Sequence, residues 1–365
     1  MPSRHFFTAQ AGFDAARQLH KLPAGHRASR LHGHSFLVRV RAALDEGWAA
    51  FPGGELSRLQ DTLAAVAAPL DHGLLNEQVD EPSDDRLARW VSARLALPQA
   101  PAVGVQSAAH SGVDIDDHGV AHAWRRYRFQ SAHRLPNVPL GHKCGRMHGH
   151  GFEAVVHVRL AEGEASHVAA DRLDGLWAPL HHQLNYTCLN ELPGLENPTS
   201  EMLSRWIWQR LVAGTEGLAS VRVYETASCG AQYDGATHRI WKDFHLDSAL
   251  RLRRAPAGSP LAGLHGHTYT LRLHLSAELD ELRGWAVDFG DVKELFKPVF
   301  KALDHHPLHD IPDLPDCDTA SLARWVLAQA CTRLPQVSRV DLFETEGCGA
   351  IVCAGDVASA LGACA

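Results

Sequence analysis

The chain has 365 residues, which is longer than one hydrophobic core usually supports and predicts two or three domains. Its 45% hydrophobic and 21% charged residues are typical of a globular protein, and its net charge of −7 argues against nucleic acid as the main partner. The first residues lack the apolar core of a signal peptide and no window resembles a membrane span. We therefore expect a cytoplasmic protein, not membrane-bound, whose eight cysteines are reduced. The 25 histidines point to metal or proton chemistry.

The same set of elements is predicted three times along the chain. The tripeptide His-Gly-His occurs at 32–34, 148–150 and 265–267. After each copy come an alternating segment typical of a half-buried strand, a helical pattern and another β-rich segment. The helical patterns contain Trp90, Trp206 and Trp325, which we expect to be buried anchors. The interval from His34 to Asp71 is 37 residues, as is that from His267 to Asp304, so the three copies align as repeats.

These repeats predict an α+β fold made of three tandem units. The expected boundaries are 1–118, 119–236 and 237–365. Each unit has the order β-β-α-α-β-β, which favours an antiparallel sheet covered by two helices. Because an open sheet has unpaired edges, three such sheets joined edge to edge would satisfy them.

The middle unit contains the residues of a metal site. Side chains at i and i+2 of a strand point to one face, so His148 and His150 can bind one ion. His133 lies fifteen residues before His148, and three imidazoles with an open fourth position are typical of catalytic zinc. The same interval leads to Arg17 in the first unit and Leu250 in the third, so we expect no catalytic zinc there.

Cys144 occurs four residues before His148, and the other two units have Ala28 and Leu261 at this position. The cysteine alone allows three interpretations: a fourth ligand of a structural site, a buried thiol, or a catalytic base or nucleophile. The cations of Lys143 and Arg146, and a metal, would favour the thiolate.

One family resembles this chain at several motifs. The stretches "FQSAHRLPNVPLGHKCGRMHGH" (129–150), "LNELPGLENPTSEMLSRWIW" (189–208) and "VYET" (223–226) resemble 6-pyruvoyl-tetrahydropterin synthase and its bacterial branch, 6-carboxy-5,6,7,8-tetrahydropterin synthase. The third unit matches through "GWAVDFGDVKELFKPVFKALDHH" (284–306), and the first through "RLHGHSFLVRV" and "LDHGLLN". The resemblance implies three tandem tunnelling-fold (T-fold) units that form a pseudo-trimeric barrel.

The resemblance also implies roles for individual residues. His133, His148 and His150 would bind Zn²⁺, and Cys144 would abstract a proton. Glu201 and Glu225 would anchor the pterin ring, with Thr199 and Thr226 nearby, because carboxylates accept from adjacent N–H donors. The residues we expect to bind the triphosphate are Lys143, Arg146 and Arg134.

The family also uses an Asp-His pair from another subunit to tune the cysteine. The middle unit departs from this pattern, because the spacing from Asn190 to Trp206 puts Asn185–Tyr186 at the pair position. The outer units keep Asp71–His72 and Asp304–His305. We therefore predict one composite site per chain, completed by one of these two pairs, with preference for the third unit. The other pair would be a helix-start cap.

The resemblance predicts a zinc-dependent lyase of queuosine biosynthesis. It would convert 7,8-dihydroneopterin triphosphate to 6-carboxy-tetrahydropterin, releasing acetaldehyde and triphosphate. Its partners would be this small-molecule substrate and a second chain, as a homodimer of pseudo-trimers. Two alternatives stay open: an enzyme acting on another pterin, and a non-catalytic pterin-binding scaffold.

Overall fold

The structure is a computed structural model, which describes residues 3–45, 47–280, 284–314 and 316–355. Unit 1 contains β1 (Ser3–Arg17), β2 (His32–Ala42), α1 (Glu55–Ala67), α2 (Asp84–Arg94), β3 (Ala102–Ala108) and β4 (Ser111–Ile115). Unit 2 contains β5 (Ala121–His133), β6 (His148–Arg159), α3 (Ser166–Leu184), β7 (Thr187–Cys188), α4 (Ser200–Leu211), β8 (Leu218–Thr226) and β9 (Cys229–Tyr233). Unit 3 contains β10 (His238–Leu250), β11 (His265–Ser276), α5 (Phe289–Leu303), α6 (Thr319–Cys331), β12 (Val337–Thr345) and β13 (Cys348–Ala354).

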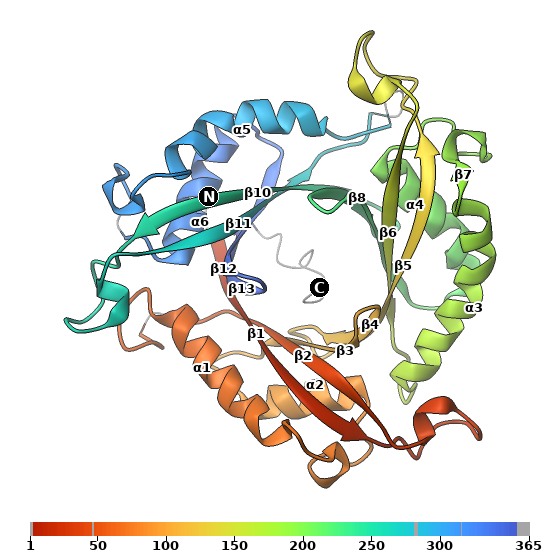
Figure 1. Cartoon of the computed structure of the whole chain (residues 1–365), viewed down its shortest axis with the longest axis horizontal. Coiled ribbons are helices and arrows are strands. Elements are labelled where there is room, and N and C mark those ends of the chain that lie inside the picture. Colours follow the sequence, from red (N-terminus) through yellow and green to blue (C-terminus); the bar gives the residue numbers. More distant parts are fainter. Residues whose placement is uncertain (1–2, 46, 281–283, 315, 356–365) are drawn as a thin grey trace.

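The sheets of the three units join into one closed ring. The strand order is β4-β3-β2-β1-β13-β12-β11-β10-β9-β8-β6-β5-β7, and a further β4–β5 pairing closes it. The three junctions between units are antiparallel: β4 with β5, β9 with β10, and β13 with β1. Twelve of the strands thus form a barrel with no free edge between units, and the short β7 pairs in parallel with β5. Figure 1 looks down the axis of this ring, and the six α-helices of the described residues lie outside it.

Strand alternation separates an apolar outer face from a polar inner face. On β2, Phe36, Val38 and Val40 are buried, and these residues form part of the core under the helices of unit 1. Arg39 and Arg41 alternate with them and line the interior of the barrel. Burial of the apolar outer face by helices is what drives each unit to fold.

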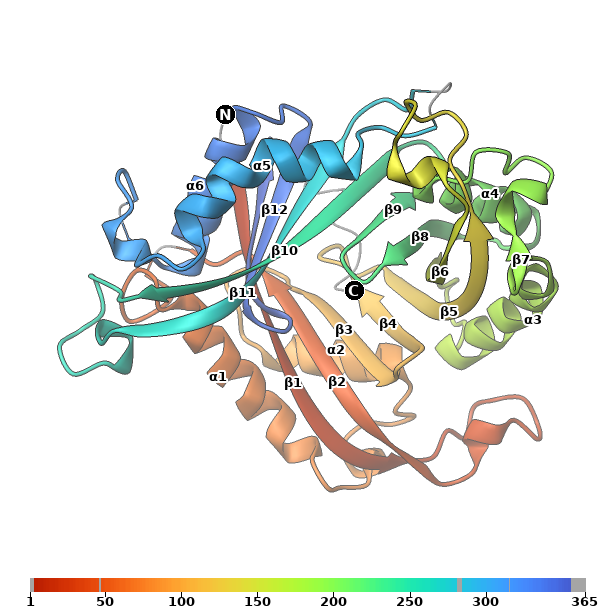
Figure 2. The same cartoon turned by 45° about the horizontal axis from the view of Figure 1, so that its top comes forward.

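The repeat prediction is confirmed in its element order and in the register of the hairpins. Arg17, His133 and Leu250 are the cross-strand partners of His32, His148 and His265, the first histidines of the three tripeptides. These long hairpins, β1–β2, β5–β6 and β10–β11, have loops that stand out from the ring (Figure 2).

Two expectations about side chains were wrong. Trp206 is buried, at 2% exposure, but Trp90 and Trp325 are half-buried. Trp206 is covered because the loop before α4 packs on it, and its Nε1 donates to Pro193 O at 3.0 Å. Asp71 and Asp304 are not helix-start caps; they follow helix ends, and each accepts a hydrogen bond from a strand backbone N–H.

No helix in the part of the chain that the structure describes is long and apolar enough to span a membrane. The seven cysteines among the described residues are free thiols.

Candidate active site

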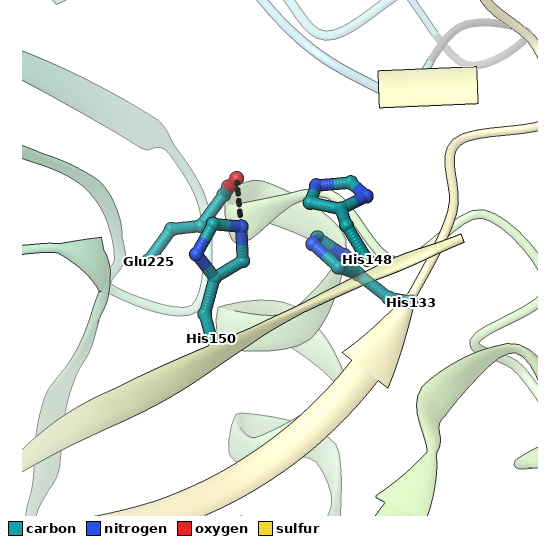
Figure 3. Close-up of side chains that lie close together, drawn as sticks. All are labelled: His133, His148, His150 and Glu225. Atoms are coloured by element: carbon teal, nitrogen blue, oxygen red, sulfur yellow. Dashed lines mark ion pairs between the residues drawn. The ribbon is translucent and has the colours of Figure 1, made fainter. Parts of the chain in front are cut away.

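Three histidines and a glutamate converge at the end of the β5–β6 hairpin. His133 ends β5, His148 and His150 begin β6, and Glu225 lies near the end of β8. One ligand atom from each residue lies within 4.8 Å of those of the other three. Figure 3 shows the three imidazoles and the carboxylate turned toward one another, with His150 Nε2 3.4 Å from Glu225 Oε1. This arrangement could hold a metal ion.

Hydrogen bonds to main-chain carbonyls orient two of the imidazoles. His133 Nδ1 donates to Pro198 O at 3.1 Å, and His148 Nδ1 donates to Arg146 O at 2.8 Å. The Nε2 atom of each ring is then the free ligand atom, and His133 Nε2 is buried with no hydrogen-bond partner among the described residues. Burial also lowers the pKa of His133, which favours the neutral imidazole that a metal requires. Three imidazoles and a carboxylate fit Zn²⁺.

In units 1 and 3, other residues occupy the positions equivalent to the metal ligands of unit 2. Arg17 is fully buried, and its guanidinium donates to Asp84 Oδ1 at 2.6 Å and to Pro82 O at 3.0 Å. Leu250 is 2% exposed and belongs to the apolar core of unit 3. Neither side chain offers a metal ligand at the position of His133.

A cavity of about 810 Å³ adjoins the histidine cluster and lies between units 2 and 3; we call it the interface cavity. Unit 2 contributes Cys144, His148, His150, Glu201 and Glu225 to its wall. Unit 3 contributes Lys242 from β10, Trp285, Val287 and Asp288 from the segment before α5, and Phe289 and Lys293 from the first turns of α5. The direction of the ring is therefore settled: the neighbour that faces the unit 2 site is unit 3.

The contributions of Trp285, Asp288, Lys242 and Lys293 were not predicted. The stretch 284–306 carried a family resemblance and the third unit was preferred as the neighbour, but the direction of the ring could not be derived from the sequence. Lys242 Nζ donates to Ser228 Oγ at 2.9 Å, and Lys293 lies in the first turns of α5. Together with Lys143 and Arg146, they give the interface cavity four cationic residues. Arg134, the third expected cation, is not among the residues that line it.

Cys144 lies in a short 3₁₀ turn, Lys143–Gly145, that a histidine holds in place. The backbone N–H of Cys144 donates to His142 Nδ1 at 3.2 Å, and His142 Nε2 lies 3.6 Å from Asp288 Oδ2 of unit 3. Burial, followed by the carboxylate of Glu225, raises the pKa of the Cys144 thiol, and Lys143 opposes this shift without reversing it. In the protein without metal, the expected stabilisation of the thiolate is thus outweighed.

The residues expected to bind a pterin lie in two groups. Glu201 is buried and its Oε1 accepts a hydrogen bond from the backbone N–H of Ala286 in unit 3 at 3.1 Å. Thr199 caps α4 and donates to Gly284 O, so it too bridges the two units. Burial raises the pKa of Glu201 to about 7.

Glu225 and Thr226 form the second group. Glu225 accepts from Ser200 Oγ at 2.8 Å and lies in the metal cluster, while Thr226 is 3.1 Å from Cys229 Sγ.

The Asp-His pairs lie elsewhere, on the exposed edges of their own units. Within each pair the imidazole Nδ1 is close to the carboxylate, at 2.9 Å for His72–Asp71 and 3.0 Å for His305–Asp304. The two histidine side chains are 79% and 75% exposed, and neither pair is among the residues that line the interface cavity. Within one chain, therefore, neither pair lines the cavity that contains Cys144, which does not agree with the prediction that one of them completes the site there.

In unit 2, Asn185 and Tyr186 adopt the same backbone geometry as the pairs. Asn185 Oδ1 accepts from Gln130 N at 2.9 Å, as Asp71 does from Asp14 N. Tyr186 has a φ of 59°, close to the 56° of His72. The position that the sequence spacing gave to Asn185–Tyr186 is therefore confirmed.

Comparisons with known proteins agree with the repeat. The family model described as 6-pyruvoyl tetrahydropterin synthase matches residues 7–108, 122–236 and 239–354. The chain is similar to 6-carboxy-5,6,7,8-tetrahydropterin synthase of Synechocystis sp., at 37% identity over 121 residues, which are 30% of this chain and 90% of the relative. It is also similar to dihydroneopterin monophosphate aldolase of Pyrococcus furiosus, at 33% identity over 84 residues, which are 22% of this chain and 70% of the relative.

Among solved structures, 6-pyruvoyl tetrahydropterin synthase of Caenorhabditis elegans aligns with a TM-score of 0.29 and 16% identity, over 31% of this chain and 92% of that chain. The Synechocystis relative and the nematode structure each have about the size of one unit of this chain.

Proposed function

Because the chain belongs to the 6-pyruvoyl tetrahydropterin synthase family, we propose that it is a zinc-dependent 6-carboxytetrahydropterin synthase of the queuosine (7-deazapurine) pathway. It converts 7,8-dihydroneopterin triphosphate to 6-carboxy-tetrahydropterin. The observation that carries this proposal is the cluster of His133, His148 and His150, of which His148 and His150 line the same cavity as Cys144. The similarity to the Synechocystis synthase supports the choice of substrate.

In this proposal each group at the interface cavity has a separate task. A zinc ion held by the three histidines would act as a Lewis acid on the side-chain oxygens of the substrate. Cys144 takes a proton from the substrate side chain, and the buried carboxylate of Glu201 accepts from the adjacent N–H groups of the pterin ring. The four cations, Lys143, Arg146, Lys242 and Lys293, bind the triphosphate.

We further propose that an Asp-His pair reaches Cys144 from a second chain. Both pairs are exposed and lie away from the cavity of their own chain, so a stacked copy is the remaining source. Three large apolar side chains also stand exposed directly before the three His-Gly-His tripeptides: Leu31 at 65%, Met147 at 54% and Leu264 at 64%. These three residues, which we call the apolar rim, lie in three separate hairpins, and we propose that they form the contact between two chains in a homodimer of pseudo-trimers.

The test combines metal content with turnover of 7,8-dihydroneopterin triphosphate. We expect about one zinc per chain, loss of the zinc in His148→Ala, and loss of turnover with retained zinc in Cys144→Ala. Of His72→Ala and His305→Ala, one should lose turnover and the other should keep it. Three zinc ions per chain would contradict the assignment of a single metal site, and full activity of both histidine variants would contradict the composite site.

Experiments on the same purified protein also test two alternative functions. The similarity to the Pyrococcus aldolase supports an enzyme that cleaves the side chain of another pterin, such as a dihydroneopterin monophosphate. The replacement of the Asp-His pair by Asn185–Tyr186 in unit 2 is the observation that favours a non-catalytic pterin-binding scaffold. Mass spectrometry of the products from both phosphate esters identifies the substrate, while zinc binding without any product would indicate the scaffold.

A further inference from the structure

Residues 284–288 of unit 3, which lead into α5, lie against unit 2 at the interface cavity; we call them the bridging segment. The carbonyl of its first residue accepts a hydrogen bond from Thr199 Oγ1, and the N–H of its third residue donates to Glu201 Oε1 at 3.1 Å. Both partners lie at the start of α4 and belong to the residues expected to bind the pterin. The bridging segment is therefore attached to the pterin side of the site.

The last residue of the bridging segment, Asp288, faces the loop that contains Cys144. The N–H of Cys144 donates to His142 Nδ1 at 3.2 Å, so this nitrogen carries no proton and the proton of the neutral ring is on Nε2. His142 Nε2 lies 3.6 Å from Asp288 Oδ2, so its N–H faces a carboxylate. Asp288 is itself fixed, because its Oδ1 accepts from Gly290 N at 2.7 Å and from Asp291 N at 3.2 Å.

Cys144 and Glu201 are thus attached to one short segment of the neighbouring unit, although they lie in different elements of unit 2. Cys144 is in the loop between β5 and β6, and Glu201 is in the first turn of α4. A substrate held by Glu201 meets the thiol correctly only if the loop and the helix keep a fixed distance. An error of about 1 Å in such a placement costs about a hundredfold in rate.

The loops of the other two units show which part of this linkage depends on the histidine. In unit 1 the equivalent residue is His26, which accepts from Ala28 N at 3.1 Å and whose Nε2 lies 3.0 Å from Asp171 of unit 2. In unit 3 it is Ser259, whose Oγ accepts from Leu261 N at 3.3 Å in the same 3₁₀ turn. The turn therefore forms with a serine, whereas these two contacts across units are made by histidines.

We infer that His142 is a positioning residue, which holds the thiol of Cys144 at a fixed distance from the pterin-binding residues through Asp288 of unit 3. The inference rests on the proposed function for the reaction that this placement serves. The placement itself can be measured without a substrate, because it determines how readily the thiol reacts.

The test compares His142→Ser with His26→Ser in the full-length, zinc-loaded protein. Serine keeps the turn, as it does in unit 3, and removes the contact across the units. His26→Ser is the matched control, because its loop has Ala28 in place of the cysteine. The first readout is the rate at which iodoacetamide alkylates Cys144, measured by peptide mass spectrometry against Cys188, another free thiol of the same molecule.

We expect alkylation of Cys144 to become at least about threefold faster in His142→Ser, because a loosened turn exposes the half-buried thiol and relieves the burial that raises its pKa. The second readout is turnover. The value of kcat should fall about tenfold while KM changes by less than about twofold, because the pterin-binding residues stay attached to the bridging segment. In His26→Ser both readouts and the zinc content should be unchanged.

Asp288→Asn tests the other end of the contact. Asparagine keeps the oxygen that caps α5 and replaces the carboxylate that faces His142 Nε2. This variant should lower kcat by a similar factor, and the double variant should be no slower than His142→Ser. A loss in the double variant equal to the product of the two single losses would show that the two residues act separately.

Two further results would overturn the inference. One is an unchanged alkylation rate of Cys144 in a folded His142→Ser protein. The other is an equal fall of kcat in His142→Ser and His26→Ser, which would give both histidines only the task of joining units. If the wild-type protein has no turnover but His142→Ser still reacts faster with iodoacetamide, the proposed function fails and the placement of the thiol stands. Thermal unfolding checks that each variant is folded.

Discussion

In unit 1, Arg17 occupies the position of a possible metal ligand and forms an ion pair instead. Its guanidinium lies where unit 2 has the imidazole of His133, and its partner Asp84 is itself held by Ser107, whose Oγ donates to Asp84 Oδ2 at 2.6 Å. The side chains of Arg17 and Asp84 are 0% and 6% exposed. Although burial opposes ionisation, Arg17 holds the pKa of Asp84 below its usual value. The pair thus stabilises the junction of unit 1 with unit 2, where Arg17 also lies 3.3 Å from His167.

Arg17→Ala should therefore destabilise the protein strongly. Removing one partner of a buried ion pair leaves the other charge without compensation, which costs about 3–5 kcal/mol. Urea unfolding measures this free energy. Replacing both partners, in Arg17→Met/Asp84→Leu, should restore most of the stability. Lys21→Ala, which breaks the exposed pair with Asp80, is the control and should change little. Equal effects of Arg17→Ala and Lys21→Ala would contradict this account.

The buried carboxyl of Glu201 predicts a pH dependence of pterin binding. Its pKa is raised by burial to about 7, from an ordinary value of 4.5, so the carboxylate that should accept from the pterin forms only as the pH rises through 7. The affinity for a non-reacting pterin such as neopterin should therefore increase from pH 6 to pH 8, and fluorescence titration measures it. In Glu201→Gln this increase should be absent. A variant with an unchanged pH profile would show that another group is responsible.

The raised pKa of Glu201 also makes the stability of the folded protein depend on pH. Because the folded state binds this proton more tightly than the unfolded chain, the contribution of Glu201 to stability is present below about pH 4.5 and is lost as the pH rises through about 7.

At the scale of the elements, the three hairpins share one register. For metal binding they differ in the residue that stands opposite the first histidine of each tripeptide. In unit 3 that position is Leu250, opposite His265, and the rest of the cluster is present, since His267 Nε2 lies 3.7 Å from Glu344 Oε2. The third face therefore lacks one ligand for a metal site.

Leu250→His should create a second metal site. The new imidazole would stand opposite His265 as His133 stands opposite His148, so the zinc content should rise from about one to about two ions per chain, measured by elemental analysis. Leu250→Asn is the matched control, because it also buries a polar side chain but adds no imidazole. A folded Leu250→His protein with unchanged zinc content would show that the β10–β11 register alone does not make the site.

These elements also show what could be predicted from the sequence. The cluster of His133, His148 and His150 was predictable, because period-2 alternation and hairpin register depend on local spacing. The position of Asn185–Tyr186 was predictable for the same reason. The contribution of Asp288 and Lys293 was not, since it depends on the direction in which the units follow one another around the ring.

The raised pKa of Cys144 was also missed. It results from burial and from Glu225, a neighbour in space that lies 81 residues away in the sequence.

At the scale of the whole molecule, the apolar rim predicts association of two chains. Leu31→Glu/Leu264→Glu puts charges on the rims of units 1 and 3 and leaves the lining of the interface cavity intact. We expect a change from dimer to monomer in analytical ultracentrifugation, with zinc retained and turnover lost. Val212→Glu, at another exposed apolar position with 46% exposure, is the control and should stay dimeric. A rim variant that stays dimeric would show that the chains meet elsewhere.

The β9–β10 junction joins units 2 and 3 within one polypeptide, and the interface cavity lies beside it. Where separate subunits form such a ring, the cavity exists only at protein concentrations above their dissociation constant. Here the facing surfaces are held at a high effective concentration by the chain itself, so the cavity persists at any dilution. Pterin binding should thus survive at concentrations where paired chains have separated. Any step that depends on an Asp-His pair from a second chain should be lost on dilution. The dependence of turnover on protein concentration therefore distinguishes what one chain does alone from what requires two chains.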